Sequence, residues 1–279
     1  MLSSQDKIVL EEKAALLRED IVEMIGVGKV GHLGGSCSLA DIVSVLYFHK
    51  MRHDPEMPNL KNRDRFLLSK GHAAIVQYAA LMECGYFKKE EYIHTLKKLG
   101  SRLQGHPDLT KLPGIEGNTG SLGQGVSLAA GMAAGLKLNG LDSKVYVVTG
   151  DGELAEGQIW EAFMSAANFK LDNLRVIIDR NGLQATGKTK ERFQIGAIEE
   201  KVKAFGFHVI TIDGHDMEAI ADAFDLADTI KEKPVAIIAD TIKGKGIPFA
   251  EGVVSFHNGS LTQEQYDAAK SHLKEVRKA

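Results

Sequence analysis

The stretch VYVVTGDGELAEG (residues 145–157) decides the fold, because a run of β-favouring residues ends in Gly-Asp-Gly and helix-favouring residues follow. A strand without polar alternation is buried on both faces, as in a parallel sheet covered by helices. Apolar runs of the same kind occur at 174–178, 208–213 and 235–240. Their alternation with helical patterns predicts an α/β fold with an open, mostly parallel sheet and helices on both faces.

The remaining patterns predict further helices, one more strand and two structured loops. A strand is expected over 63–69, and Ser38 is expected to cap the second helix. The loops are the glycine-rich 26–38 and the long segment 99–125. The expected helices cover 8–25, 38–50, 73–84, 122–139, 154–169, 198–205 and a C-terminal stretch from 262. Since nothing resembles a linker, we expect one domain over residues 1–279.

The bulk composition is typical of a soluble globular protein. The chain has 279 residues, 44% of them hydrophobic, and 34 basic against 37 acidic side chains give a net charge of −3. No run of Lys or Arg favours nucleic acid, and no apolar segment approaches the ~20 residues that cross a bilayer. The two cysteines, Cys37 and Cys84, match neither a metal site nor a disulfide framework. With no signal-peptide pattern, a cytoplasmic location is expected.

Two polar side chains follow neighbouring predicted strands. Asp151 comes directly after the first strand of the opening stretch, and Asn181 follows the next strand thirty positions later, in IIDRNGL. Ligands of open parallel sheets lie beyond the carboxyl ends of the strands, beside helix N-termini. We therefore expect Asp151 and Asn181 to face one cleft.

A carboxylate and an amide oxygen are a sparse ligand set that suits Mg²⁺ when the phosphates of a ligand complete its octahedral coordination. A glycine at 152 would let backbone N–H groups approach those phosphates. The alternative is a simple hairpin turn, which Asp-Gly commonly forms. Three features favour the metal site: the helical pattern after Gly152, the position of Asn181, and the further glycine-rich loops.

GDG followed by Asn after about thirty residues resembles the diphosphate-binding motif of thiamine-diphosphate enzymes, and the details resemble transketolase. Six motifs occur in transketolase order over nearly the whole chain: RDRFLLSKGH, QGHPD, NTGSLGQG, GDGELAEG, TIDGHD and TIKGKG. The resemblance implies a thiamine-diphosphate-binding fold, a PP-type domain that binds the diphosphate. It also implies transfer of a two-carbon ketol unit from a ketose to an aldose, usually as sugar phosphates.

The resemblance also implies roles for particular residues. Mg²⁺ would be held by Asp151, Asn181 and the backbone carbonyl of Leu183. The catalytic histidines would be His32 and His257, which contact sugar hydroxyls and aid proton movement, and His106, which with His72 positions cofactor and sugar. The cofactor would be contacted by His72, Gly120, Ser121, Leu122, Gly152, Asn181 and His257, and Glu156, grouped with them, would belong to an intersubunit acidic network.

The sequence departs from the usual pattern near the sugar-facing side. Leu33 replaces a common proline, Lys70 a common asparagine, and Arg180 an Asp or Asn, while FHN replaces the usual HG around His257. These changes leave the identity of the sugar open.

Transketolases take a glutamate that activates the aminopyrimidine from a second, pyrimidine-binding domain. Only 98 residues follow Asn181 (279 − 181), and we expect them to complete the first sheet. The chain therefore resembles one half of a split transketolase. We expect the pyrimidine-binding and C-terminal domains on a partner chain, with a homodimer inside a heterotetramer, and no turnover by this chain alone.

Three alternatives stay open at this stage. The first is the diphosphate-binding subunit of a 2-oxoacid dehydrogenase, which shares the metal motif but would not be expected to carry this set of histidines. The second is a catalytically silent binding module. The third, a nucleotide-binding Rossmann domain, lacks a suitably placed G-x-G-x-x-G turn or Walker lysine.

Overall fold

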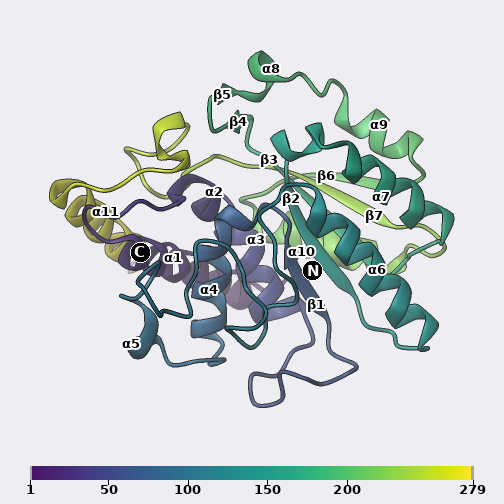
Figure 1. Cartoon of the computed structure of the whole chain (residues 1–279), viewed down its shortest axis with the longest axis horizontal. Helices are drawn as coiled ribbons and strands as arrows, with labels where there is room; N and C mark the ends of the chain where they lie inside the picture. Colours follow the sequence, from purple (N-terminus) through teal and green to yellow (C-terminus); the bar gives the residue numbers. More distant parts are fainter. Residues whose placement is uncertain (1, 278–279) are drawn as a thin grey trace.

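Five parallel strands form the central sheet, in the order β1-β2-β3-β7-β6 (Figure 1). They are β1 (Arg65–Leu68), β2 (Val145–Gly150), β3 (Leu174–Arg180), β7 (Val235–Asp240) and β6 (His208–Asp213). This computed structural model describes residues 2–277. The predicted open parallel sheet is confirmed, and every strand expected from the apolar runs is present.

Helices cover both faces of the sheet, as predicted. Alternate residues of a strand point to opposite faces, and accordingly Tyr146 and Ile177 pack in one core whereas Val147 and Ile178 pack in the other. The first core is closed by α1 (Ser4–Ile25), α3 (Ala40–Val45), α4 (Ala74–Glu83), α10 (Met217–Thr229) and α11 (Gln263–Val276). The second core is closed by α6 (Gln124–Leu138), α7 (Gly157–Asn168) and α9 (Ile198–Ala204).

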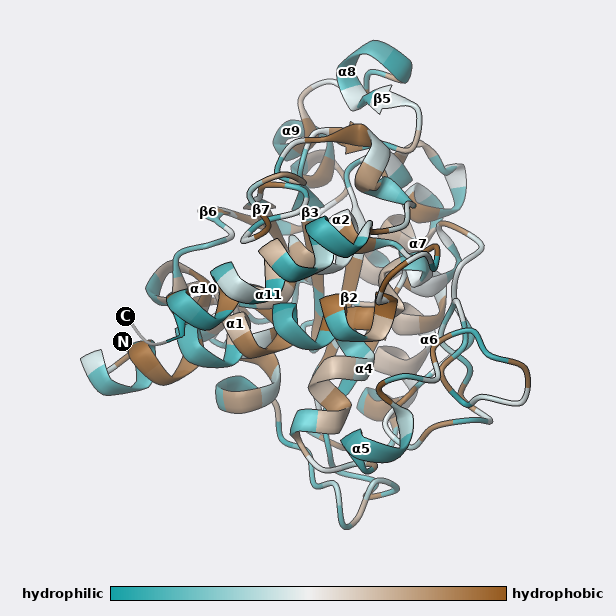
Figure 2. Cartoon of the chain, turned by 90° about the vertical axis from the view of Figure 1, so that its left-hand side faces the viewer, coloured by the Kyte–Doolittle hydropathy of each residue, from teal (hydrophilic) through white to brown (hydrophobic). Residues whose placement is uncertain are grey.

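Local sequence signals account for several helix ends. The Ser3 hydroxyl accepts a hydrogen bond from the Asp6 N–H at the start of α1, and Thr262 and Gln265 form a capping box at the start of α11. Hydrophilic and hydrophobic residues alternate along α10 and α11 in Figure 2, as expected for amphipathic helices over a core. The remaining short elements are α2 (Leu33–Cys37), η1 (Leu46–Lys50), η2 (Gly71–Ala73), α5 (Lys89–Tyr92), η3 (Gly152–Ala155), β4 (Leu183–Gln184), β5 (Gly187–Lys188), α8 (Thr189–Arg192) and η4 (Val254–His257).

Two predictions for the glycine-rich segment 26–38 were wrong. Its second half is not a loop but the buried helix α2, whose glycines allow close packing: a Cβ on Gly34 would lie 3.0 Å from the Phe256 carbonyl oxygen. Ser38 does not cap the start of α3, which begins only at Ala40; it is the C-cap residue of α2. The Ser38 hydroxyl instead donates to the Asp179 carboxylate at 2.8 Å.

Other differences concern elements with weak local signals. The sequence patterns did not predict α10, or the small β4–β5 hairpin that follows Asn181. Strand β6, expected to be buried on both faces, is only half-buried because it lies at the edge of the sheet. Among the described residues, none of the helices combines the length and apolar character needed to span a lipid bilayer.

Candidate functional site

The register of the sheet brings Asp151 and Asn181 together. Gly150, the last residue of β2, pairs with Asp179 near the end of β3, so the residues that follow leave the sheet side by side. Beyond these strand ends is a pocket of about 200 Å³. Its lining consists of Gly35, Lys70, His72, Leu122, Gly150, Asp151, Gly152, Glu153, Asn181, Leu183, Gln184, Ala185, Lys243 and His257.

Asp151 is almost fully buried at the floor of this pocket. Its Oδ2 atom accepts hydrogen bonds from the Gly182 N–H at 3.0 Å and from the Thr189 hydroxyl at 3.1 Å. Burial, and secondly the nearby Asp179 carboxylate, raise the pKa of Asp151 above its ordinary value. A cation in the pocket would therefore stabilise the ionised form of the Asp151 carboxylate.

The orientation of Asn181 is fixed by its neighbours. Its Nδ2 donates to the Asp179 carboxylate at 3.0 Å, and its Oδ1 accepts from the Leu183 N–H at 3.1 Å. The Leu183 carbonyl accepts from the Lys243 ammonium at 2.8 Å. The carbonyl expected to bind a metal thus already contacts a positive charge.

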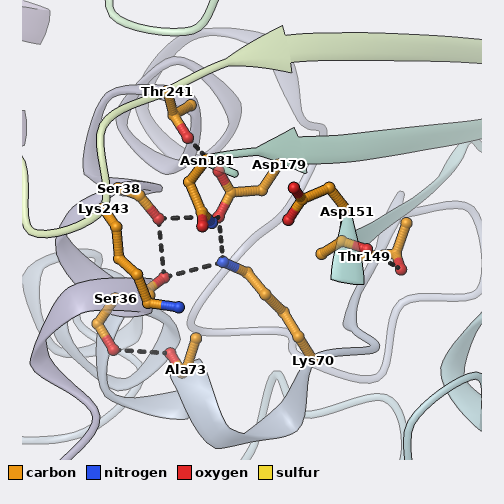
Figure 3. Close-up of polar contacts among 12 residues, drawn as sticks. Ser36, Ser38, Lys70, Ala73, Thr149, Asp151, Asp179, Asn181, Thr241 and Lys243 are labelled. Carbon is orange, nitrogen blue, oxygen red and sulfur yellow. Dashed lines mark hydrogen bonds and ion pairs between the residues drawn. The ribbon is translucent and has the colours of Figure 1, made fainter. Parts of the chain in front are cut away.

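Asp179 is the centre of a buried polar network (Figure 3). Its carboxylate accepts from the Lys70 ammonium, the hydroxyls of Ser38 and Thr241, and the Asn181 amide. Burial by itself raises the pKa of the Asp179 carboxyl, but Lys70 and these hydrogen bonds together hold that pKa below its ordinary value. The network joins the segments before α3, after β1, after β3 and after β7 at one point.

A second buried carboxylate, Glu153, organises the rim of the pocket. Its Oε1 accepts from the Ser69 hydroxyl at 2.5 Å and the Gly123 N–H at 2.8 Å. Its Oε2 accepts from the Thr149 hydroxyl at 2.8 Å and the Gly150 N–H at 3.1 Å. Glu153 therefore fixes the GSLG loop against the ends of β1 and β2.

Three of the predicted histidines form a cluster at one side of the pocket. The ring centroids of His32 and His72 are 5.1 Å apart, those of His72 and His257 5.1 Å, and those of His32 and His257 5.6 Å. Burial, with neighbouring cations, lowers the pKa of His32 to about 4 and that of His257 to about 3, and also depresses that of His72. All three rings are therefore neutral near pH 7.

Lys243 fixes the tautomer of His257. The ammonium lies 2.8 Å from His257 Nδ1, and because an ammonium only donates, Nδ1 must accept. The proton of the neutral ring is then on Nε2. Burial and Lys70 lower the pKa of Lys243 to about 8, so this lysine remains mostly charged at neutral pH.

The other predicted residues lie around the pocket rather than in its lining. The His106 ring packs on Gly120, where φ is +133° and a Cβ would lie 2.4 Å from His106 Cδ2, so only glycine fits. His106, Ser121 and Glu156 are all exposed. The structure thus brings most of the predicted residues into one pocket or its immediate border, and leaves these three at the surface.

Several residues in or beside the pocket had no function predicted from the sequence. Glu153 and Lys243 lie inside motifs that were identified, GDGELAEG and TIKGKG, so the signal was available. Thr189 had no recognisable signal, because its approach to Asp151 depends on the β4–β5 hairpin. The residues that line the pocket without a predicted role are Gly35, Lys70, Gly150, Glu153, Gln184, Ala185 and Lys243.

The donor set of the pocket suits a phosphate-bearing ligand with a metal ion. Within residues 2–277 no group of three or more His, Cys, Asp or Glu side chains could hold a metal by itself, so any cation here needs oxygens from a ligand. Lys70 and Lys243 supply positive charge. The buried Gln184 Nε2 has no hydrogen-bond acceptor among the described atoms, as expected of a donor that serves a bound ligand.

A pocket at the carboxyl ends of two adjacent parallel strands, bordered by GDG and a following Asn, is the arrangement expected of a thiamine-diphosphate-binding domain. The domain family "Transketolase, thiamine diphosphate binding domain" matches residues 9–275. The chain therefore belongs to the transketolase family, and this prediction is confirmed.

Named relatives agree with this assignment. The chain is 43% identical, over 97% of its length and 98% of the relative, to a 6-deoxy-6-sulfo-D-fructose transketolase subunit of a Clostridium strain. It is 41% identical to an apulose-4-phosphate transketolase subunit of Phocaeicola vulgatus, covering 95% of this chain and 94% of that relative. The predicted correspondence to the N-terminal subunits of split transketolases is thus confirmed.

Solved structures agree with the fold. Transketolase from Campylobacter jejuni superposes with a TM-score of 0.91 at 36% identity, and transketolase from Leishmania mexicana with a TM-score of 0.84 at 30% identity. The match covers 98% of this chain but only 43% of the Campylobacter chain, so this chain spans less than half of that enzyme.

Proposed function

We propose that this chain, with a partner subunit, transfers a two-carbon ketol unit from a ketose to an aldose through thiamine diphosphate and Mg²⁺. The observation that carries the proposal is the pocket in which Asp151, Asn181 and the Leu183 carbonyl converge beside three neutral histidines. The names of the relatives support phosphorylated or sulfonated sugars as substrates.

Asp151, Asn181 and the Leu183 carbonyl would hold the Mg²⁺, while Gly152 and Lys243 would approach the diphosphate. Bound thiamine diphosphate supplies a carbanion that cleaves and forms carbon–carbon bonds next to a carbonyl. The residues of this chain bind and orient. Because burial keeps both rings neutral, His32 can donate one hydrogen bond and accept another, whereas His257, whose Nδ1 accepts from Lys243, can donate to a sugar hydroxyl through Nε2.

The proposed partner is a C-terminal subunit that carries the pyrimidine-binding domain and its glutamate. Two similar proteins of about this length are named subunits, which supports a divided enzyme. The side formed by α6 and α7 also exposes Leu138 (88%), Met164 (55%) and Phe169 (64%), and large exposed apolar residues favour association. We infer a homodimer within a cytoplasmic heterotetramer, with exposed Glu156 directed to the neighbouring subunit.

Two experiments test this function. The chain is purified alone and co-expressed with the transketolase C-terminal subunit of the same genome, and ketol transfer from sugar phosphates is assayed for both preparations. We expect turnover only in the complex, and robust turnover by the chain alone would contradict the proposal. Decarboxylation of 2-oxoacids by the complex, without ketol transfer, would favour the 2-oxoacid dehydrogenase alternative.

Titration calorimetry separates the enzyme from a catalytically silent module. We expect the complex to bind thiamine diphosphate only when Mg²⁺ is present. His106→Ala should then lower turnover more than it lowers the unfolding midpoint, because the ring lies outside the cores that hold the fold. Unchanged turnover would remove His106 from the catalytic residues.

A further inference from the structure

The motif TIDGHD contains a histidine that the proposed function leaves without a role. His215 lies two residues after β6, and its side chain is 12% exposed. Gly214 brings this turn against the segment after β7: its N–H donates to the Asp240 carbonyl at 2.8 Å, and a Cβ on this glycine would lie 2.5 Å from Thr241 Cγ2. The imidazole is thereby placed beside the backbone that leads to Lys243.

Both ring nitrogens of His215 have a defined partner. Nε2 lies 2.8 Å from the backbone nitrogen of Ile242, and because an N–H only donates, Nε2 must accept. The ring proton is then on Nδ1, which donates to Asp41 Oδ2 at 2.6 Å. An imidazolium could not make both bonds, because its Nε2 would carry a proton. The arrangement therefore requires one particular tautomer of the neutral ring.

Arg18 in turn fixes the Asp41 carboxylate. Its Nη1 donates to Asp41 Oδ1 at 2.9 Å and its Nη2 to Oδ2 at 2.5 Å, a bidentate pair whose side chains are 9% and 7% exposed. Burial by itself raises the pKa of Asp41, but Arg18 and the hydrogen bond from His215 hold that pKa below its ordinary value. The carboxylate is therefore ionised and acts as an acceptor towards the imidazole.

The turn that His215 contacts carries a lysine of the pocket. Lys243 directly follows Ile242, and its ammonium lies in the pocket lining. On the other side of this lysine, the Gly244 N–H donates to the Gly34 carbonyl at 2.9 Å. Lys243 is thus held by a backbone hydrogen bond on each side. Of the two, the bond to the imidazole depends on a side chain, so a substitution can remove it.

We propose that His215 is a positioning residue for the diphosphate site, acting through the Ile242 backbone on the Lys243 ammonium. Asp41 and Arg18 support this role by setting the tautomer that lets the ring accept. The inference rests on the proposed function, in which Lys243 approaches the diphosphate. His215 itself does not line the pocket, so its effect on a ligand must pass through the backbone.

The test is titration calorimetry of thiamine diphosphate with Mg²⁺, in the complex with the C-terminal subunit. His215→Leu removes the acceptor, whereas His215→Gln places an amide oxygen near the position of Nε2. We expect His215→Leu to weaken binding by about tenfold or more, and His215→Gln to restore most of the affinity. The matched control is His53→Leu, at a ring that also bonds through both nitrogens, to the Tyr47 carbonyl and the Tyr86 hydroxyl, but does not line the pocket.

A purely structural role would lower the urea unfolding midpoint of His215→Leu without changing its affinity. The inference is therefore refuted if His215→Leu weakens binding no more than His53→Leu does, or if His215→Gln binds no better than His215→Leu. Nitrogen-15 NMR of the histidine-labelled wild-type chain needs no variant: a proton on Nδ1 of His215 is expected, and a proton on Nε2 would also overturn the inference. If the wild-type complex does not bind thiamine diphosphate, the proposed function fails and this inference fails with it.

Discussion

Lys70→Met tests whether the buried ion pair below the pocket is an essential part of the fold. The Lys70 side chain is 3% exposed and that of Asp179 is 0% exposed, so bulk water solvates neither charge. The substitution keeps the approximate length and apolar character of the lysine stem. It removes the ammonium that contacts Asp179 and donates to the Gly35 carbonyl at 3.0 Å.

The expected loss of stability is about 3–5 kcal/mol, because removing one partner leaves a buried charge without compensation. The hydrogen bonds that Asp179 keeps, from Ser38, Thr241 and Asn181, place the expectation towards the lower end of this range. The second variant is Lys70→Met combined with Asp179→Asn. This double variant removes both charges. Its loss of stability should therefore be smaller than the sum of the losses caused by Lys70→Met and by Asp179→Asn, by about 1–3 kcal/mol.

The stability that the Lys70–Asp179 pair contributes should depend on pH. In the wild type the pKa of Asp179 is lowered, so this pair stabilises the fold above the ordinary carboxyl pKa, and that contribution is lost as the pH falls through the depressed value. Without Lys70, burial is the largest remaining influence and raises the pKa of Asp179. The difference between Lys70→Met and wild type should therefore be largest near pH 8 and shrink on acidification.

The assay is urea unfolding followed by circular dichroism, at pH 8 and pH 5, with Lys203→Met as the exposed control. The control should change the unfolding free energy by no more than about 0.5 kcal/mol. A loss below about 1 kcal/mol for Lys70→Met at pH 8, or strict additivity in the double variant, would refute the view that Lys70 compensates a buried carboxylate.

Three further predictions concern the pocket. Asp151→Asn should weaken Mg²⁺-dependent binding of thiamine diphosphate by about 100-fold, measured by calorimetry, because it removes the proposed metal's only carboxylate ligand; unchanged affinity would exclude Asp151 as a ligand. Gly120→Ala should destabilise by about 2 kcal/mol or more in urea unfolding, because a Cβ would meet the His106 ring; an unchanged midpoint would contradict this contact. Because His32 and His257 have depressed pKa values, of about 4 and about 3, stability should decrease as the pH falls from about 6.5 towards 4, measured as the urea midpoint; a flat profile in wild type would contradict the burial of neutral rings.

The sheet could be predicted because its signals are local. Uninterrupted runs such as VYVV and VAIIAD specify strands buried on both faces, and the helices between them specify parallel pairing. Helix α2 was not predicted because its sequence, LGGSC, has poor intrinsic helix propensity. It is helical because its small residues fit between other segments, and that information is not in the segment itself.

The candidate site likewise contains some contacts that local sequence patterns predict and others that they do not. Asp151 and Asn181 follow adjacent strands, so their convergence was predictable from strand order alone. Ser38 was expected to cap the second helix because hydroxyls often accept from the free N–H groups of a first turn, but α3 begins only at Ala40, and the Ser38 hydroxyl donates to a buried carboxylate 141 positions away in the sequence. Contacts of this kind depend on the complete tertiary structure, so local sequence patterns do not predict them.

The charges around the pocket indicate why metal and cofactor should bind together. Lys70 is paired with Asp179, and the Glu153 carboxylate accepts four hydrogen bonds from the chain, which leaves Asp151 and Lys243 as the principal charges facing the cavity. A metal ion alone would be attracted by Asp151, the Asn181 amide oxygen and the Leu183 carbonyl, but repelled by Lys243. A diphosphate alone would be attracted by Lys243 but repelled by Asp151. Each ligand compensates the charge that opposes the other. Binding of the metal and the diphosphate together should therefore be more favourable than the sum of their separate binding free energies.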